Sequence, residues 1–164
     1  MKVVFSHGKE SGPWGRKIKV LADIATRKGF VVESIDYTDS LDPDVRVKRL
    51  DDYLSKEKSA CVLVGSSMGG YVSAVNSVTH NVKGLFLLAP ALYMPNYQIQ
   101  HYPVNCNTVV VHGWSDNVIP SSNSVQFAQE AKATLHIIEG DHSLTAALPE
   151  ISIWFERFLE GVSP

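Results

Sequence analysis

A serine, an aspartate and a histidine each stand directly after a short apolar segment of this sequence. They are Ser67, Asp116 and His142, in that chain order. A serine hydroxyl is a poor nucleophile at neutral pH, because it needs an imidazole to take its proton and a carboxylate to orient that imidazole. These residue types therefore predict attack on an acyl carbon by Ser67, with His142 as the base and Asp116 as the acid that orients it.

Ser67 is the most specific of these positions, because it is the centre of the frame Gly65-x-Ser67-x-Gly69. This frame predicts a nucleophile elbow, a sharp strand-to-helix turn that lifts the serine hydroxyl above a sheet. A Cβ two residues before or after the serine would collide in so tight a turn, and the serine itself is expected in a strained backbone conformation. Ser66 does not fit the frame, because no glycine flanks it at this spacing.

The elements that would position these residues alternate between strand-like and helix-like segments. Apolar residues at helical spacing predict helices, and short runs that are apolar throughout predict strands buried on both faces. Such strands, separated by helices, favour a three-layer α/β/α sandwich with about six mainly parallel strands, in a single domain over residues 1–164. The predicted strands are 3–6, 30–37, 60–64, 85–89, 108–111 and 135–138, and the predicted helices are 14–28, the segment from Asp42-Pro43 onward, 68–79, 125–131 and 151–159.

Each candidate residue has an alternative reading. Ser67 could be an ordinary helix N-cap, and Asp116 could hold its own turn or cap the next helix. Asp141 is a rival acid, although neighbouring residues on one loop usually point apart, and it precedes His142 directly. The other histidines stand in less suitable places, either before a glycine in a turn (His7, His112), at the end of the elbow helix (His80), in a loop (His101) or in a strand (His136).

Four motifs together resemble the α/β-hydrolase superfamily, in particular its small bacterial serine hydrolases and esterases with little or no lid. His7-Gly8 matches the turn after their first strand, and residues 65–70 match their Gly-x-Ser-Met-Gly-Gly elbow. Residues 112–120 match the segment that carries their acid, and residues 140–142 match the segment that carries their base. The resemblance covers nearly the whole chain and implies a minimal α/β-hydrolase fold, without the first two strands and the cap domain of larger members.

The same resemblance implies how the site would work. It assigns Ser67 as nucleophile, Asp116 as acid and His142 as base. A developing oxyanion needs fixed donors, and one would be the backbone N–H of Met68 at the start of the elbow helix. The other, by resemblance to the family, would be the backbone N–H of Lys9.

The loops that face the site supply candidates for a substrate pocket. Residues 90–107 stand where larger hydrolases carry a lid, but the segment is too short for a helical cap. Since it is rich in Leu, Tyr, Met and Ile, it is expected either to form an apolar wall over a short or medium acyl chain or to pack against the core. Nothing in the sequence marks selection of an acidic or cationic substrate. The candidate lining residues are Ser11, Trp14, Trp114, Leu92 and Tyr93. For the first three, a surface or packing role is an equal alternative.

Composition and charge narrow the class of protein. A net charge of −2 over 164 residues, with 45% hydrophobic residues, is typical of a globular protein and points neither to nucleic acid nor to an anionic membrane. No apolar stretch approaches the ~20 residues of a membrane span, and the first residues do not resemble a signal peptide, so a cytoplasmic location is expected. Cys61 and Cys106 fit neither a disulfide framework nor a metal site, and no metal or cofactor is expected.

The sequence therefore predicts a cofactor-free serine hydrolase that cleaves small acyl esters through an acyl-enzyme. The same residues would serve a thioesterase or a small amidase or peptidase, and a non-catalytic binding protein on a hydrolase scaffold is the remaining alternative. Two nucleotide-binding patterns are excluded. Gly8-Lys9 lacks the first glycine of a phosphate-binding loop, and residues 65–70 carry a serine in place of the second glycine of the dinucleotide fingerprint.

Overall fold

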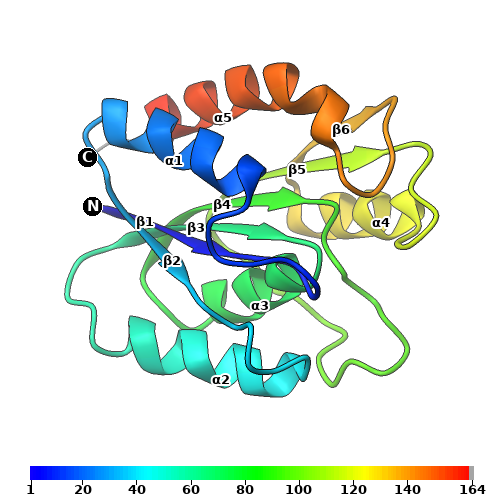
Figure 1. Ribbon diagram of the computed structural model, residues 1–164. Coiled ribbons are helices and arrows are strands. Elements are labelled where there is room, and N and C mark those ends of the chain that lie inside the picture. Colours follow the sequence, from blue (N-terminus) through cyan, green and yellow to red (C-terminus); the bar gives the residue numbers. More distant parts are fainter. Residues whose placement is uncertain (163–164) are drawn as a thin grey trace.

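The computed structural model describes residues 1–162 and contains a six-stranded sheet between two layers of helices (Figure 1). The order across the sheet is β2-β1-β3-β4-β5-β6, and each neighbouring pair is parallel. The predicted parallel α/β/α sandwich is therefore confirmed. The strands are β1 (Lys2–Ser6), β2 (Val31–Ile35), β3 (Cys61–Ser66), β4 (Val82–Leu88), β5 (Asn107–Gly113) and β6 (Thr134–Ile138).

Helices connect most of the strands, a last helix follows β6, and together they cover both faces of the sheet. α1 and α5 pack on one face, whereas α2 and α3 lie on the other, at the bottom of Figure 1. Asp42 caps α2 as predicted, because its side chain accepts a hydrogen bond from the backbone of Asp44 at 2.8 Å. The helices are α1 (Arg16–Arg27), α2 (Pro43–Leu54), α3 (Met68–Ser77), α4 (Ser121–Ala131) and α5 (Leu148–Val162), and a short 3₁₀ turn (Thr145–Ala147) that was not predicted precedes α5.

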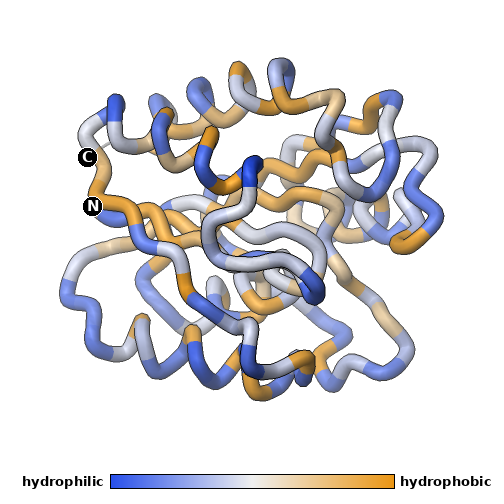
Figure 2. The backbone as a smooth tube through the Cα atoms, in the orientation of Figure 1, coloured by the Kyte–Doolittle hydropathy of each residue, from blue (hydrophilic) through white to orange (hydrophobic). Residues whose placement is uncertain are grey.

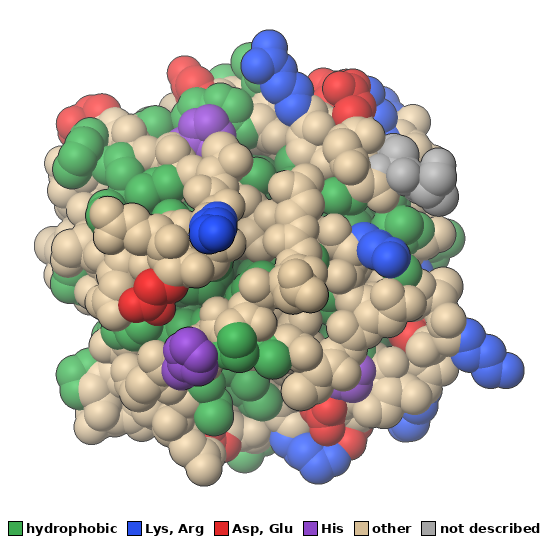
Figure 3. Space-filling view, turned by 180° about the vertical axis from the view of Figure 1, so that it is seen from behind, with side chains coloured by type: hydrophobic (Ala, Val, Ile, Leu, Met, Phe, Trp, Pro, Cys, Tyr) green, Lys and Arg blue, Asp and Glu red, His purple; other side chains and the backbone are tan. Residues whose placement is uncertain are grey.

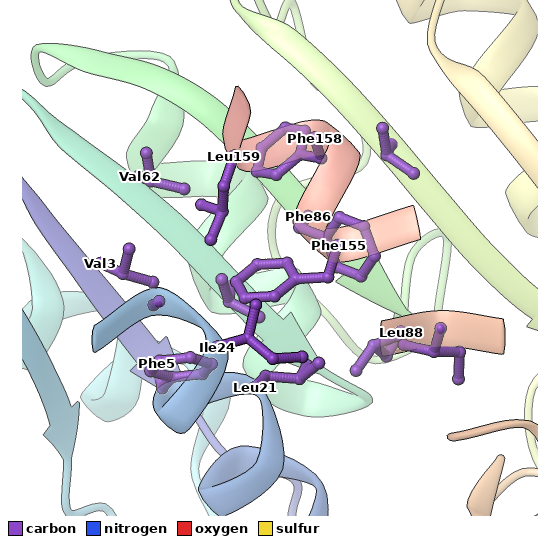
Figure 4. Close-up of a cluster of buried hydrophobic side chains, with 14 of the residues drawn as sticks. Val3, Phe5, Leu21, Ile24, Val62, Phe86, Leu88, Phe155, Phe158 and Leu159 are labelled. Carbon is purple, nitrogen blue, oxygen red and sulfur yellow. The ribbon is translucent and has the colours of Figure 1, made fainter. Parts of the chain in front are cut away.

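Alternate side chains of each strand enter separate hydrophobic cores on the two faces of the sheet. In β1, Val3 and Phe5 pack with α1 and α5, while Val4 packs with the helices of the opposite face. Figure 4 shows the first of these cores, where the rings of Phe86 and Phe155 meet edge to face at 5.0 Å. The inner strands are accordingly among the most continuously hydrophobic segments in Figure 2, as a sheet covered on both sides requires, whereas the edge strand β2 includes Glu33 and Ser34.

The parallel arrangement decides where a site can form. Because all six strands run in one direction, the loops that follow β1, β3, β5 and β6 gather at the same edge of the sheet, toward the right of Figure 1. Those four loops carry the polar residues that the sequence places after each strand. The fold therefore brings together segments that are up to 135 residues apart in the chain (residue 142 minus residue 7).

The outer surface is of mixed charge on the side opposite to that of Figure 1. There the Lys and Arg side chains stand singly among Asp and Glu side chains, and they do not gather into one basic patch (Figure 3). Within residues 1–162, none of the helices has both the length and the apolar character that crossing a membrane would require.

Candidate active site

Ser67 occupies the sharp turn between β3 and α3, with φ of 54° and ψ of −120°. L-residues rarely adopt this backbone conformation, which costs about 1–3 kcal/mol, so the surrounding structure must hold it. The backbone N–H of Ser67 donates to the carbonyl of Leu88 at 3.0 Å, and its own carbonyl accepts from Gly70 and Ala91, both at 2.9 Å. The strained elbow predicted from the glycine frame is confirmed.

The glycines at 65 and 69 are required because other backbone atoms approach them too closely for any side chain. A Cβ on Gly65 would lie 2.6 Å from the carbonyl carbon of Gly69, and a Cβ on Gly69 would lie 2.6 Å from the carbonyl oxygen of His7. The start of α3 therefore packs directly against the end of β1. As a result, the loop after β1 lies beside Ser67.

Ser67, His142 and Asp116 form a continuous chain of hydrogen bonds across three loops. His142 Nε2 lies 3.0 Å from Ser67 Oγ, and His142 Nδ1 lies 2.7 Å from Asp116 Oδ2. An ionised carboxylate only accepts hydrogen bonds, so Nδ1 carries the proton and Nε2 is left to accept from the hydroxyl of Ser67. The rival Asp141 turns to its own loop, where Oδ1 accepts from the backbone of Ser143 at 3.0 Å. Asp116 is therefore the carboxylate that orients His142.

Asp116 has a fully buried side chain, and both of its oxygens are hydrogen-bonded. Oδ1 accepts from the backbone N–H groups of Val118 and Ile119, each at 2.8 Å, and Oδ2 lies 3.0 Å from His112 Nε2. Burial raises the pKa of Asp116, but the hydrogen bonds from His142 and the two amides outweigh it, so this pKa lies below its ordinary value. The turn-holding role weighed for Asp116 thus coexists with its contact to His142.

The loop after β1 is fixed from behind by Arg46, a fully buried arginine of α2. Its guanidinium donates to the carbonyl oxygens of Gly8 at 2.9 Å and Lys9 at 3.0 Å. The His7 ring accepts at Nε2 from the backbone of Tyr37 at 2.9 Å, so Nδ1 carries the proton and donates to Gly8 at 2.8 Å. Two donors therefore hold the same peptide carbonyl, and His7 has the structural role expected of it.

This arrangement sets the direction of one backbone N–H group. A trans peptide points its C=O and its N–H in opposite directions, so the Lys9 N–H points away from Arg46 and from the protein interior. Gly8 lies against Ser67, because a Cβ on it would be 3.5 Å from Ser67 Cβ. In the described residues 1–162, the N–H groups of Lys9 and Met68 donate to no protein acceptor. Two unused donors therefore flank Ser67.

A cavity of about 690 Å³ opens beside Ser67, which is the size of a pocket for a small molecule. The floor includes Ser67 and His142, and Ser11 lines it as predicted. Within residues 90–107, the stretch Met94, Pro95, Asn96 and Tyr97 forms one wall, while Leu92 and Tyr102 pack into the core. One part of this segment therefore forms a wall of the cavity and another part packs against the core, so both roles expected for it occur.

The structure does not bring the other four candidate lining residues into this cavity. Trp14 and Trp114 face solvent, with 47% and 65% of their surface exposed, and neither lines the cavity. Leu92 is fully buried in the core, and Tyr93 turns toward α4, where its hydroxyl donates to Glu130 at 2.9 Å. The left-handed backbone at Tyr93, with φ of 56°, redirects the chain at this point. Residue type alone could not show which way these loop residues face.

Two basic residues of the site were missed. Arg46 holds the loop after β1, and Lys17 reaches the cavity from the first turn of α1. No cationic side chain was predicted from the sequence in the cavity wall, whereas the structure places Lys17 there. A signal was available for Lys17, since Arg16 and Lys17 open α1 without any acidic residue in its first turn, where the helix dipole disfavours cations.

The fold and the site geometry define an α/β-hydrolase, and comparison with solved structures agrees. A Xanthomonas campestris pv. campestris protein assigned to the alpha/beta superfamily of hydrolases is 31% identical, with 98% of each chain covered and a TM-score of 0.90. The chain belongs to the uncharacterised protein family UPF0227, whose family model matches residues 2–103. No curated protein matches the sequence significantly.

More distant structures share the fold. Mouse alpha/beta hydrolase domain-containing protein 10 is 17% identical, with 99% of this chain and 90% of that chain covered and a TM-score of 0.80. Est1E from Butyrivibrio proteoclasticus is also 17% identical, with 97% and 86% covered and a TM-score of 0.76. These similarities extend over nearly the whole chain, so the fold is common to all of these proteins.

Proposed function

We propose that this protein is a serine hydrolase that cleaves small acyl esters through an acyl-enzyme. The observation that carries the proposal is the chain of hydrogen bonds from Asp116 through His142 to Ser67, with distances of 2.7 and 3.0 Å. It begins at a strained serine beside two unused backbone donors and opens on a cavity of about 690 Å³. Structural relatives assigned as hydrolases and esterases support the same class of enzyme.

The proposed reaction begins when Ser67 Oγ attacks the acyl carbon and its proton passes to His142 Nε2. Asp116 stabilises the imidazolium that forms. When the tetrahedral intermediate collapses, the bond to the leaving oxygen breaks, and that oxygen takes the proton from His142 and departs as an alcohol. Water then attacks the acyl-enzyme by the same route, which releases the carboxylic acid and restores Ser67.

The carbonyl oxygen becomes negatively charged in both tetrahedral intermediates. In this proposal the N–H groups of Met68 and Lys9 donate to it, and removal of one such donor typically slows an enzyme by ~10²–10³. Met68 is the first residue of α3, so the helix dipole adds positive potential at the same point. Because these donors are held by the backbone fold, they need no rearrangement when the charge develops.

The test is labelling with a fluorophosphonate, which reacts with activated serines, beside assays with p-nitrophenyl acetate and butyrate. Wild type should be labelled and should hydrolyse the esters, whereas Ser67→Ala should lose labelling and reduce turnover by about 10³ or more. Ser59→Ala is the control, since it removes an exposed hydroxyl outside the cavity lining and should keep the label. Circular dichroism checks that each variant is folded.

The same assays separate the alternatives. Thioester and amide substrates with the same acyl group show whether the leaving group prefers sulfur or nitrogen to oxygen. A folded wild type that is not labelled and hydrolyses none of these substrates would reject the proposal and favour a non-catalytic binding protein on this scaffold.

A further inference from the structure

Lys17 places an ammonium group in the wall of the cavity, next to the proposed nucleophile. Its Nζ donates to the carbonyl of Ser143 at 2.7 Å and to Ser66 Oγ at 3.3 Å. Ser143 follows the proposed base in the chain, and Ser66 precedes the proposed nucleophile. The ammonium group therefore contacts the sequence neighbours of both residues. An ammonium group has three N–H donors, and the two hydrogen bonds leave the third available to a molecule in the cavity.

This cation has no carboxylate partner of its own. Among the described residues 1–162, Lys17 takes part in no ion pair, whereas Lys2, Lys28 and Lys48 each have at least one. Asp141 attracts Lys17 from beyond ion-pair distance, but its carboxylate accepts from the backbone and the hydroxyl of Ser143. Since charges that are removed from water are normally paired, the arrangement leaves one positive charge uncompensated in the cavity.

The position of Lys17 is also unfavourable for the fold. Burial lowers the pKa of Lys17, which means that the folded protein disfavours its charged form. The residue lies in the first turn of α1, where a cation opposes the helix dipole, and no side chain caps this end of the helix. A residue whose burial or position destabilises the fold is expected mainly at a functional site.

The remaining charged groups at the cavity do not cancel this charge. Lys9 and Glu10 line the rim, and both side chains are exposed to solvent. His142 contributes no negative charge, because an imidazole ring is either neutral or cationic. Exposed charges are screened by water and salt, so the half-buried Lys17 dominates the local potential.

We propose that Lys17 binds a carboxylate of the substrate, and that the protein acts on esters that carry a second, free carboxylate, such as monoesters of short dicarboxylic acids. That the substrate is an ester rests on the proposed function, whereas the anion-binding site rests on the geometry around Lys17 alone. The free carboxylate would accept from the third N–H of Lys17. Because Ser66 and Ser67 are adjacent, the free carboxylate lies only a few bonds from the carbon that Ser67 attacks.

The first experiment compares charged and neutral esters of the same shape, with acid release followed in a pH-stat. The substrates are monoethyl glutarate and its primary amide, which carry the group on the acyl side, and O-acetylglycolate and its primary amide, which carry it on the alcohol side. Wild type should prefer the charged member of at least one pair by about 10- to 100-fold in kcat/KM, the usual effect of a hydrogen bond to a charged group. The substrate pair in which the charged ester is preferred shows whether the bound carboxylate lies on the acyl side or the alcohol side of the ester bond.

Variants then assign the preference to Lys17. Lys17→Met should bring the ratio of kcat/KM for the charged and neutral esters to about 1, whatever its effect on the two separate rates, and Lys17→Arg should retain part of the preference. Lys19→Met is the matched control, because this lysine of the same helix is exposed and lies outside the cavity lining. A wild type without any preference, or a Lys17→Met variant that loses charged and neutral substrates equally, would overturn the proposal in favour of a purely structural bridge.

A binding measurement tests the anion-binding site independently of ester hydrolysis. Glutarate is titrated by calorimetry into Ser67→Ala and into the double variant Ser67→Ala/Lys17→Met, neither of which needs to turn over. Binding at least tenfold weaker in the double variant supports the anion site even if the protein hydrolyses no ester. Equal binding, or none to either variant, overturns the site while ester hydrolysis by wild type keeps the proposed function intact.

Discussion

Two aspartates near the candidate site have different surroundings, although both lie on loops at the same edge of the sheet. Asp116 is fully buried, and its Oδ2 lies 2.7 Å from His142. Asp141 is exposed and accepts from the backbone and hydroxyl of Ser143 in its own turn. The sequence could place both after a strand, but only the direction of each side chain distinguishes the one that reaches the histidine.

We predict that Asp116→Asn lowers kcat by about 10²–10⁴, because an amide no longer holds His142 in the tautomer that accepts from Ser67. Asp141→Asn is the matched control and should change kcat less than about threefold, since it leaves the Asp116–His142 contact intact. Both are measured with p-nitrophenyl acetate at pH 7.5. If Asp141→Asn caused the larger loss, the assignment of the acid would be wrong.

At the scale of helices, strands and loops, the sequence predicted those features that depend on residues close together in the chain. The elbow and the segments that carry Asp116 and His142 could be found because each depends on residues within about ten positions of one another. Arg46 could not be found in this way, because it contacts a loop that lies 38 residues away in the chain. The charge pattern at the start of α1 marks Lys17, but it does not show which loop, 126 residues away, this side chain contacts. Such contacts depend on how the helices pack on the sheet, which no local pattern records.

Arg46 offers a test of how α2 supports the loop after β1. We predict that Arg46→Met lowers kcat by about 10- to 100-fold with little change in KM, because a released Lys9 N–H would weaken a contact made only in the transition state. Arg49→Met is the matched control, since Arg49 lies on the same helix and pairs with Asp39 instead. An Arg46→Met variant that stays folded with an unchanged kcat would contradict this role.

The whole molecule buries several histidines that link its stability to pH. His7 and His112 are almost completely buried, and burial lowers the pKa of each below the ordinary value of 6.5, although hydrogen bonds to backbone carbonyls oppose the shift. The folded state therefore binds fewer protons than the unfolded state once the pH falls below 6.5. This dependence of stability on pH arises only in the folded protein, because both rings are held between separate elements.

We predict that the free energy of unfolding is highest near pH 7 and falls between pH 6.5 and pH 5, with a slope of up to about 1.4 kcal/mol per pH unit for each buried histidine. The stabilisation is complete above the unfolded pKa and is lost as the pH falls toward the lower pKa of the folded state. Urea unfolding at a series of pH values measures it. His101→Gln, which changes an exposed loop histidine, should keep the slope, and a stability that is flat or rises toward pH 5 would refute the prediction.

The left-handed backbone at Ser67 implies that this fold is less stable than its sequence could make it. Glycine adopts a φ of 54° without strain, so Ser67→Gly should unfold with a free energy about 1 kcal/mol higher than Ser67→Ala, which keeps the strain and also lacks the hydroxyl. Urea unfolding of the two inactive variants compares them directly, and equal stabilities would show that the turn is unstrained. Laboratory evolution that rewards heat resistance alone should therefore replace this serine early, and only selection for turnover would retain it.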